Sequence, residues 1–320
     1  MAITPALDQI REAQQILSAH FPPTRLVRTQ GISSQSTDVY LKIETELPTG
    51  SFKPRGALYA LAKNLERREI REVTASSTGN HGAAVAWAAK ALGVPATIFL
   101  PENPNPVKRQ KIADLGARIV EAGGADLADA FLEARAYSAR PGVYFMNDAT
   151  DLDLPAGPAT IGWEILTQLP QVVAIYVPMG DTALIRGVGA ALKQTKPGVK
   201  IIGVQAERAP SYCLSWKAGR AIPTETCDTC ADGLATRTPE PANVQAIREL
   251  VDDVVLVSEE QLISAITKLF QREMVLAEPA GAAATAAFLK RPDPTRPVVL
   301  LVTGANISDN VRLRAGIPKT

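Results

Sequence analysis

The order of apolar runs along the chain constrains its fold more than any other feature. Short runs rich in valine, isoleucine and leucine alternate with segments whose apolar residues recur at helical spacing. In the first half of the chain this pattern predicts strands at residues 39–43, 73–75, 96–100, 118–120 and 143–145, with helices at 83–92, 107–115 and 125–137. Strands and helices that alternate in this way indicate a parallel sheet.

A second alternation follows in the other half of the chain. Its predicted strands are near-continuous apolar runs at residues 172–177, 201–204, 254–257 and 298–302, which is typical of parallel strands buried on both faces. The sequence therefore predicts an α/β fold of two doubly wound parallel-sheet lobes. At 320 residues the chain exceeds the roughly 100 to 200 residues of an ordinary single core, which agrees with two lobes.

Two segments rich in proline and glycine, residues 141–142 and 154–158, mark the expected boundary between the lobes. We expect a large domain made of residues 1–66 and 150–320 and a small domain made of residues 67–149.

Charge and composition argue against several classes of protein. Lysine and arginine number 34 against 33 aspartates and glutamates, and aromatic residues make up 5%, so we expect no nucleic-acid partner. The longest apolar stretch, residues 83–100, is interrupted by Lys90 and Pro95, and the N-terminus lacks a basic region, so we expect neither a membrane span nor a secretory signal. Three cysteines and two histidines, His20 and His81, cannot supply a disulfide framework or a multi-histidine metal cage. We therefore expect a cytoplasmic protein.

Four small polar loops that contain glycine are the candidate functional segments. They are residues 49–56, 76–82, 178–184 and 302–306. Ligands of open α/β sheets gather at the carboxyl ends of the strands, where such loops lie. Each loop taken alone is more simply a turn followed by a capped helix.

Lys53 is the most informative single residue. It stands between Phe52 and Pro54 in a predicted turn, where it either extends its ammonium group into water or is desolvated. Desolvation would depress its pKa, as an amine nucleophile that forms a Schiff base requires. The loop at residues 77–81 leaves the same kind of choice open, because hydroxyls and free amides at a helix N-terminus form either an anion pocket or an ordinary cap.

Six segments in this order resemble those of one enzyme family. They are residues 49–56, 77–82, 232–235, 251–260, 278–282 and 303–306. Together they make the chain similar, from about residue 26 to about residue 306, to the fold type II pyridoxal-phosphate enzymes, in the branch of threonine ammonia-lyase (dehydratase) and serine racemase. The resemblance implies that pyridoxal 5′-phosphate (PLP) lies in the cleft between the lobes, on the large domain, and that the small domain carries the loop for the substrate carboxylate.

The resemblance also implies roles for single residues. Lys53 is expected to hold the cofactor as a Schiff base and, once freed, to take the α-proton of the substrate. Phe52 is expected to pack beside the cofactor ring, Asn80 to bond its 3′-oxygen, and Glu278 to lie near the ring. Thr303 matches the position opposite the pyridine nitrogen. Because a neutral hydroxyl does not hold that nitrogen protonated, the resemblance favours prompt β-elimination.

The phosphate loop departs from the family pattern of four glycines. Here the matching positions are Gly180, Asp181, Thr182 and Ala183, followed by Leu184. Backbone amides at a helix N-terminus still form a phosphate nest. A carboxylate within about 4 Å of a phosphate costs about 1 to 4 kcal/mol. We therefore expect Asp181 to point away and to cap the helix that begins near Leu184, unless a cation such as Arg186 neutralises it.

The resemblance assigns the substrate carboxylate to Ser77, Thr78, Asn80 and His81. Thr78 stands where racemases of the family carry a serine that reprotonates the second face and where many dehydratases carry alanine. Its hydroxyl is therefore a second candidate catalytic group, and the racemase alternative stays open.

Two further patterns concern metals. Relatives in this branch often bind a divalent cation through a glutamate and an aspartate, but the matching positions hold Gln205 and Ser211, and Glu207 is the nearby carboxylate. We expect no metal site. Cys227 and Cys230 form a C-x-x-C pair with no second pair or nearby histidine, which favours a structural or incidental role.

The resemblance implies a PLP-dependent ammonia-lyase that eliminates the β-hydroxyl of an amino acid to give a 2-oxo acid and ammonia. The candidate substrates are serine, threonine, 3-hydroxyaspartate, phenylserine and hydroxyectoine-derived compounds. The alternatives are a serine or aspartate racemase and a catalytically silent protein that binds PLP or amino acids. The resemblance implies a homodimer. Because the sequence ends at Thr320, we expect no isoleucine-binding regulatory domain.

Overall fold

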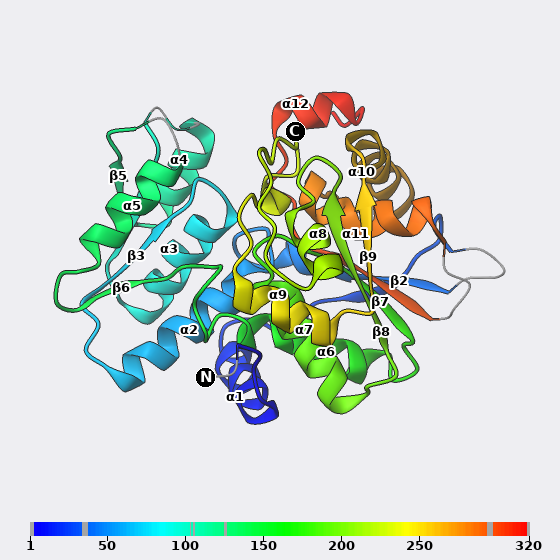
Figure 1. The fold of residues 1–320 in the computed structure, drawn as a ribbon, viewed down its shortest axis with the longest axis horizontal. Helices are drawn as coiled ribbons and strands as arrows, with labels where there is room; N and C mark the ends of the chain where they lie inside the picture. Colours follow the sequence, from blue (N-terminus) through cyan, green and yellow to red (C-terminus); the bar gives the residue numbers. More distant parts are fainter. Residues whose placement is uncertain are drawn as a thin grey trace.

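The computed structural model describes residues 3–33, 38–102, 104, 106–124, 127–292 and 297–318. Its strands are β1 (Leu26–Arg28), β2 (Val39–Ile43), β3 (Glu72–Ser76), β4 (Ala96–Leu100), β5 (Arg118–Glu121), β6 (Val143–Phe145), β7 (Ala174–Pro178), β8 (Lys200–Ala206), β9 (Asp253–Val257) and β10 (Val298–Val302). They form two sheets in two lobes, which lie side by side in Figure 1.

Helices connect the strands. They are α1 (Leu7–Ser18), α2 (Lys53–Arg67), α3 (Asn80–Leu92), α4 (Pro106–Asp114), α5 (Leu127–Tyr137), α6 (Ala156–Gln168), α7 (Ala183–Thr195), α8 (Ser211–Ala218), α9 (Pro241–Leu250), α10 (Glu259–Glu273), α11 (Pro279–Lys290) and α12 (Asp309–Arg314), with short 3-10 turns η1 (Glu44–Glu46) and η2 (Asp232–Leu234). None of the described helices is long and apolar enough to cross a membrane.

Local sequence explains several helix boundaries. Ser258 begins α10 with a capping box, because its hydroxyl accepts a bond from the Gln261 amide while the Gln261 side chain accepts one from the Ser258 amide. Ser308 caps α12 through its hydroxyl alone, which accepts a bond from the Val311 backbone amide. At the C-terminus of α3, Gly93 takes a left-handed conformation (φ 70°), which glycine adopts without steric cost.

The large sheet has the strand order β1-β2-β10-β7-β8-β9. Its neighbours are parallel except for β1, which pairs antiparallel with β2 at one edge. In register, Val302 at the end of β10 lies opposite Ile43 at the end of β2. The loops that leave the carboxyl ends of these two central strands therefore begin side by side.

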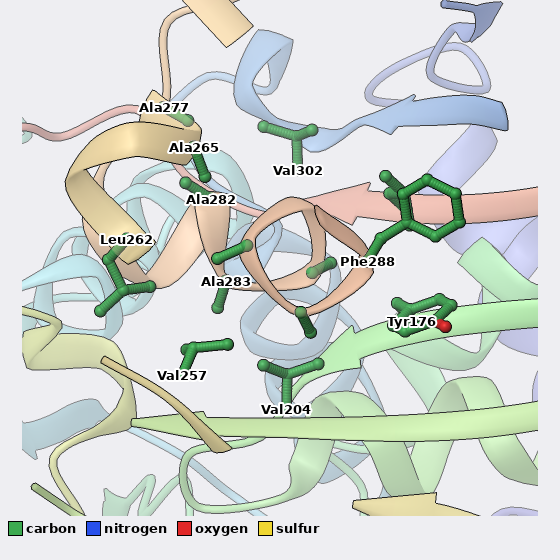
Figure 2. Packing of buried hydrophobic residues seen from close by; sticks show 14 of the residues in the cluster. Tyr176, Val204, Val257, Leu262, Ala265, Ala277, Ala282, Ala283, Phe288 and Val302 are labelled. Carbon is green, nitrogen blue, oxygen red and sulfur yellow. The ribbon is translucent and has the colours of Figure 1, made fainter. Parts of the chain in front are cut away.

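Helices cover both faces of the large sheet. Helices α10 and α11 pack on one face, where Figure 2 shows Val204, Val257, Val302 and Phe288 converging, with Phe288 edge-on to Tyr176. Helices α6, α7 and α9 cover the other face through residues such as Ile165 in α6. This arrangement buries both sides of each central strand, which is why those strands are continuously apolar.

The small sheet has the order β5-β4-β3-β6 and is wholly parallel. Side chains of adjacent residues point to opposite faces. Accordingly Ile98 joins the core beneath α2 and α3, whereas Phe99 packs with Ala130 and Ala134 of α5. Helix α2 belongs to this core although it follows β2 of the large sheet.

A buried ionic network fixes the start of α2. Arg55 is 1% exposed and makes ion pairs with Glu44 (Nε to Oε2, 2.7 Å) and with Glu164 of α6 (Nη1 to Oε1, 2.6 Å). Lys42 of β2 pairs with the other oxygen of Glu164 at 2.5 Å. These contacts anchor the helix turn that carries residue 53 to the large sheet and to α6.

The predicted fold class is confirmed, with strands at 39–43, 96–100, 143–145 and 298–302 found at those bounds. One strand was not predicted, and one prediction is wrong. The short edge strand β1 was not predicted, because three residues show no usable alternation. Residues 53–56 were expected in a turn but are the first residues of α2.

Candidate active site

The loops after β2 and β10 are joined to each other, which places Lys53 beside Thr303. Ser51 and Gly304 form an isolated β-bridge, and the Phe52 amide donates to the Thr303 carbonyl at 3.0 Å. Two segments about 250 residues apart in sequence thus form one wall of a site at the carboxyl edge of the large sheet.

A cavity opens at this edge, between the two lobes. It encloses about 660 Å³ of empty space, part of it open to solvent. Of the predicted site residues it is lined by Phe52, Lys53, Asn80, His81, Gly180, Asp181, Thr182, Ala183, Leu184, Glu278 and Thr303. Its other lining residues are Gly56, Asp148, Leu154, Pro158, Pro178, Gly233, Leu234 and Ala280.

Lys53 is the first residue of α2, with Pro54 at the next helical position, where a missing N–H is harmless. Its Nζ lies 5.8 Å from the centre of the Phe52 ring, and its side chain is 23% exposed. Burial alone lowers the pKa of Lys53, but the charge and hydrogen bond of Asp148, with further contributions from Asp181 and Glu278, raise it above its ordinary value. The prediction of a depressed pKa is therefore wrong, because neighbouring carboxylates dominate.

Asp148 is a candidate functional residue that was not predicted from the sequence. It lies between β6 and α6, and its Oδ2 is 2.6 Å from Lys53 Nζ. Burial acts to raise the pKa of Asp148, but Lys53 and His81 outweigh it and hold that pKa below the usual range. The available signal was its place just after the predicted strand at 143–145, since carboxyl ends of parallel strands carry ligand contacts.

The loop after β7 forms a backbone cradle. A Cβ on Gly180 would overlap the Gly233 carbonyl oxygen, so only glycine fits there. Thr182 has a left-handed backbone (φ 71°), and among the described residues no side chain caps the start of α7. The first amides of α7 are therefore available to an anion.

The prediction that Asp181 caps α7 is wrong. The N-cap position belongs to Thr182, whereas Asp181 Oδ1 accepts a hydrogen bond from Thr236 Oγ1 at 3.0 Å and lines the cavity. Arg186 instead donates to Thr182 Oγ1 and to the carbonyls of Ile3 and Ala149. Burial, followed by the charge of Asp148, raises the pKa of Asp181 to about 6.

A hydrogen-bonded chain crosses from the small lobe to the large lobe. Asn80 Nδ2 donates to Glu278 Oε1 at 2.7 Å, and Asn306 Nδ2 donates to Asn80 Oδ1 at 2.5 Å. Lys111 of α4 donates to the Thr49 carbonyl at 3.1 Å and to Asn306. This series of hydrogen bonds holds Asn80 at the cavity wall.

Ser77 and Thr78 lie in the bend between β3 and α3 and are not among the residues that line the cavity. The Gly79 amide donates to Ser77 Oγ at 3.2 Å. His81, in the first turn of α3, contacts the Met146 carbonyl through Nε2 at 2.9 Å. The loop thus leads into the N-terminus of α3, and of its predicted site residues only Asn80 and His81 line the cavity.

The residues considered for a metal have other partners. Gln205 Oε1 accepts from the Cys213 amide, the Ser211 hydroxyl donates to the Thr236 carbonyl, and Glu207 pairs with Lys290 at 2.9 Å. The Cys230 backbone amide donates to Glu259 Oε2 at 2.9 Å. Burial, followed by a side-chain hydrogen bond with Glu259, raises the pKa of the Cys230 thiol to about 12. The absence of a metal remains a prediction.

Comparisons with known proteins agree with this geometry. Residues 17–304 match the family described as "Pyridoxal-phosphate dependent enzyme". The chain is 38% identical to the L-threonine ammonia-lyase of Thermotoga maritima over 307 residues, which cover 95% of this chain and 76% of that protein. It resembles the solved structures of a threonine deaminase from T.th. (TM-score 0.87, 31% identity, 95% and 99% covered) and of maize serine racemase (TM-score 0.90, 26% identity, 98% and 97% covered).

Fold and site together define an enzyme that works with pyridoxal phosphate. The chain belongs to the family of pyridoxal-phosphate dependent enzymes and is a lyase of the threonine/serine dehydratase type. The cavity residues fit the cofactor, because an amine, an aromatic ring and an uncapped helix N-terminus surround one cavity.

Proposed function

We propose that the enzyme eliminates the β-hydroxyl of a β-hydroxy-α-amino acid. The substrate loses water, and the released enamine then takes up water and gives a 2-oxo acid and ammonia. The observation that carries this proposal is the place of Lys53, whose amine reaches into the cavity beside Phe52 and Thr303. The relatives named as threonine ammonia-lyase and threonine deaminase support the reaction type.

PLP supplies, when bound, the electron sink that makes the α-proton removable. In our proposal Lys53 holds the cofactor and, once released, takes that proton. The amides at residues 180–184 hold the phosphate, while Phe52, Asn80, Glu278 and Thr303 surround the ring. The uncapped start of α7 and the restricted space at Gly180 support this orientation.

The substrate carboxylate is proposed to bind at Ser77, Thr78, Asn80 and His81. The bend before α3 supports this, because it offers hydroxyls and the first amides of a helix to an anion. We also retain the small amino-acid substrate, the homodimer, the cytoplasmic location and the division into residues 1–66 with 150–320 and 67–149 as parts of the proposal.

A second candidate is amino-acid racemisation. The specific feature in its favour is the Thr78 hydroxyl, together with the likeness to maize serine racemase. In that reaction Thr78 would return a proton to the face opposite Lys53. We rank it second because Thr303 is neutral, which disfavours the long-lived carbanion that inversion requires.

The proposal is tested by an assay of 2-oxo-acid formation with purified, PLP-loaded enzyme. The panel contains L and D forms of serine, threonine, 3-hydroxyaspartate and phenylserine, with alanine as the matched substrate that lacks a β-hydroxyl. We expect a 2-oxo acid and equimolar ammonia from at least one β-hydroxy amino acid and none from alanine. Turnover of alanine at a comparable rate would contradict β-elimination.

A further inference from the structure

Asp148 is placed to act on Lys53, although no segment of the family resemblance includes it. Its Oδ2 contacts Lys53 Nζ at 2.6 Å, and both side chains are about one quarter exposed, at 25% and 23%. The two residues come from different parts of the chain, since Lys53 begins α2 and Asp148 follows β6. The pair is therefore made by the tertiary fold.

The backbone beside Asp148 is held firmly. The carbonyl of Ala149 accepts hydrogen bonds from Arg186 Nη2 at 3.3 Å and from Asn243 Nδ2 at 2.9 Å, and the Ala149 amide donates to Asn147 Oδ1 at 2.9 Å. Helices α7 and α9, together with Asn147 of the same loop, thus fix the backbone next to Asp148, as expected beside a group that must hold a defined geometry.

The other charged groups around Lys53 leave this pairing intact. His81 Nδ1 is 4.0 Å from Asp148 Oδ2, and its Nε2 contacts the Met146 carbonyl, which assigns the ring proton to Nε2. Burial lowers the pKa of His81, which favours the neutral ring near pH 7, so the charge of His81 acts on Asp148 at lower pH and Lys53 is the cation that pairs with Asp148 near pH 7. Asp181 and Glu278 act on Lys53 as further negative charges.

We propose that Asp148 is the positioning residue of Lys53. Before the cofactor attaches, Asp148 holds the Lys53 side chain as the ammonium form and directs it into the cavity. The inference rests on the proposed role of Lys53. Cofactor attachment joins Nζ to the aldehyde carbon of PLP and releases one water, and Nζ attacks only as the neutral amine. The ammonium group must therefore first give a proton to solvent, and Asp148 opposes that loss while it fixes where the amine lies.

The first experiment measures the ionisation of Lys53 directly. The full chain, freed of cofactor, is labelled with a trace of acetic anhydride between pH 6 and 11, and the extent of labelling at Lys53 is quantified by peptide mass spectrometry. For Asp148→Asn we expect the midpoint of the labelling curve to fall by about one unit or more, since an opposite charge at this distance shifts a pKa by 1 to 3 units. Labelling at pH 7.5 should rise about tenfold.

The second experiment follows the rate of covalent PLP attachment with pH by absorbance. Attachment to Asp148→Asn should be faster than to the wild type near pH 7.5, and Asp148→Glu should restore the wild-type profile in both experiments. The matched control is Asp151→Asn, because Asp151 lies on the same segment but bonds Tyr144 and the amides of Asp153 and Leu154.

Unchanged Lys53 profiles in Asp148→Asn, or equal shifts in Asp151→Asn, would overturn the inference, whatever happens to the melting temperature. A failure of the proposed function is distinguishable. Absence of 2-oxo acid from every substrate would contradict the proposed reaction, whereas the labelling curve of Lys53 would still decide the role of Asp148.

Discussion

Asp181 Oδ1 accepts a hydrogen bond from Thr236 Oγ1 at 3.0 Å, so the carboxylate in the loop between β7 and α7 is tied to the segment after η2 rather than to α7. This contact keeps a negative charge in the cavity wall beside the amides of α7. The altered loop therefore carries an electrostatic cost that a run of glycines would not.

We predict that Asp181→Asn stabilises the cofactor-free protein at neutral pH. Because the folded-state pKa of about 6 lies above the roughly 3.9 of an unfolded aspartate, ionisation costs folding free energy as the pH rises from about 4 to about 6. Asparagine keeps a partner for Thr236 and removes that cost. Urea unfolding should show a gain of about 1 to 2 kcal/mol at pH 7.5, after allowance for solvent screening, and little gain at pH 4. A gain of equal size at both pH values would contradict this explanation.

The buried ionic network beneath α2 gives a second prediction. Arg55→Met leaves Glu44 without its ion-pair partner in the core and leaves Glu164 paired with Lys42 alone, so we expect a loss of about 3 to 5 kcal/mol in unfolding free energy. The matched control is Arg71→Met, whose pair with Glu69 is exposed on both sides and should change stability by less than about 1 kcal/mol. Similar small effects in both variants would show that the network is not needed for stability.

How far the sequence alone could predict each element depends on whether local sequence or contacts across the fold hold that element in place. The parallel strands could be predicted because burial on both faces requires continuous apolar runs, as in residues 298–302. The start of α2 could not, since Lys53 and Pro54 resemble turn residues and the helix is held by Arg55 contacts made across the fold.

The site shows the same division. Motif order grouped Phe52, Lys53 and Thr303, and all three line one cavity because the loops after β2 and β10 are joined. The Asp148 pair and the Thr236 contact of Asp181 could not be predicted, because each joins side chains from distant segments whose spacing carries no pattern. The sign of the Lys53 pKa shift was missed for that reason.

Elimination should exceed inversion for any accepted substrate. Thr303 is nearly buried, at 4% exposed, and its side chain is a neutral hydroxyl. Because this residue has no carboxylate, it does not stabilise a protonated ring nitrogen. The check is to follow 2-oxo acid and optical inversion in the same reaction mixture. Faster inversion, lost in Thr78→Ala, would instead support the racemase.

Chelation should leave the enzyme unchanged. Gln205 offers a neutral oxygen already bonded to the Cys213 amide, and Glu207 is paired with Lys290, so ligand charge for Mg²⁺ or Ca²⁺ is lacking at this strand end. Dialysis against EDTA should then alter neither turnover nor melting temperature, because an ion that does not bind cannot stabilise the native state. A lower melting temperature that Mg²⁺ or Ca²⁺ restores would refute this prediction.

The central claim is that Lys53 holds the cofactor and carries the reaction, and mapping the site of attachment tests it most directly. The PLP-loaded protein is reduced with borohydride, digested and analysed by mass spectrometry. We predict a pyridoxyl-phosphate adduct on Lys53, and for Lys53→Ala neither a covalent adduct nor 2-oxo-acid formation. An adduct on a different lysine, or turnover by Lys53→Ala equal to that of the wild type, would contradict the account.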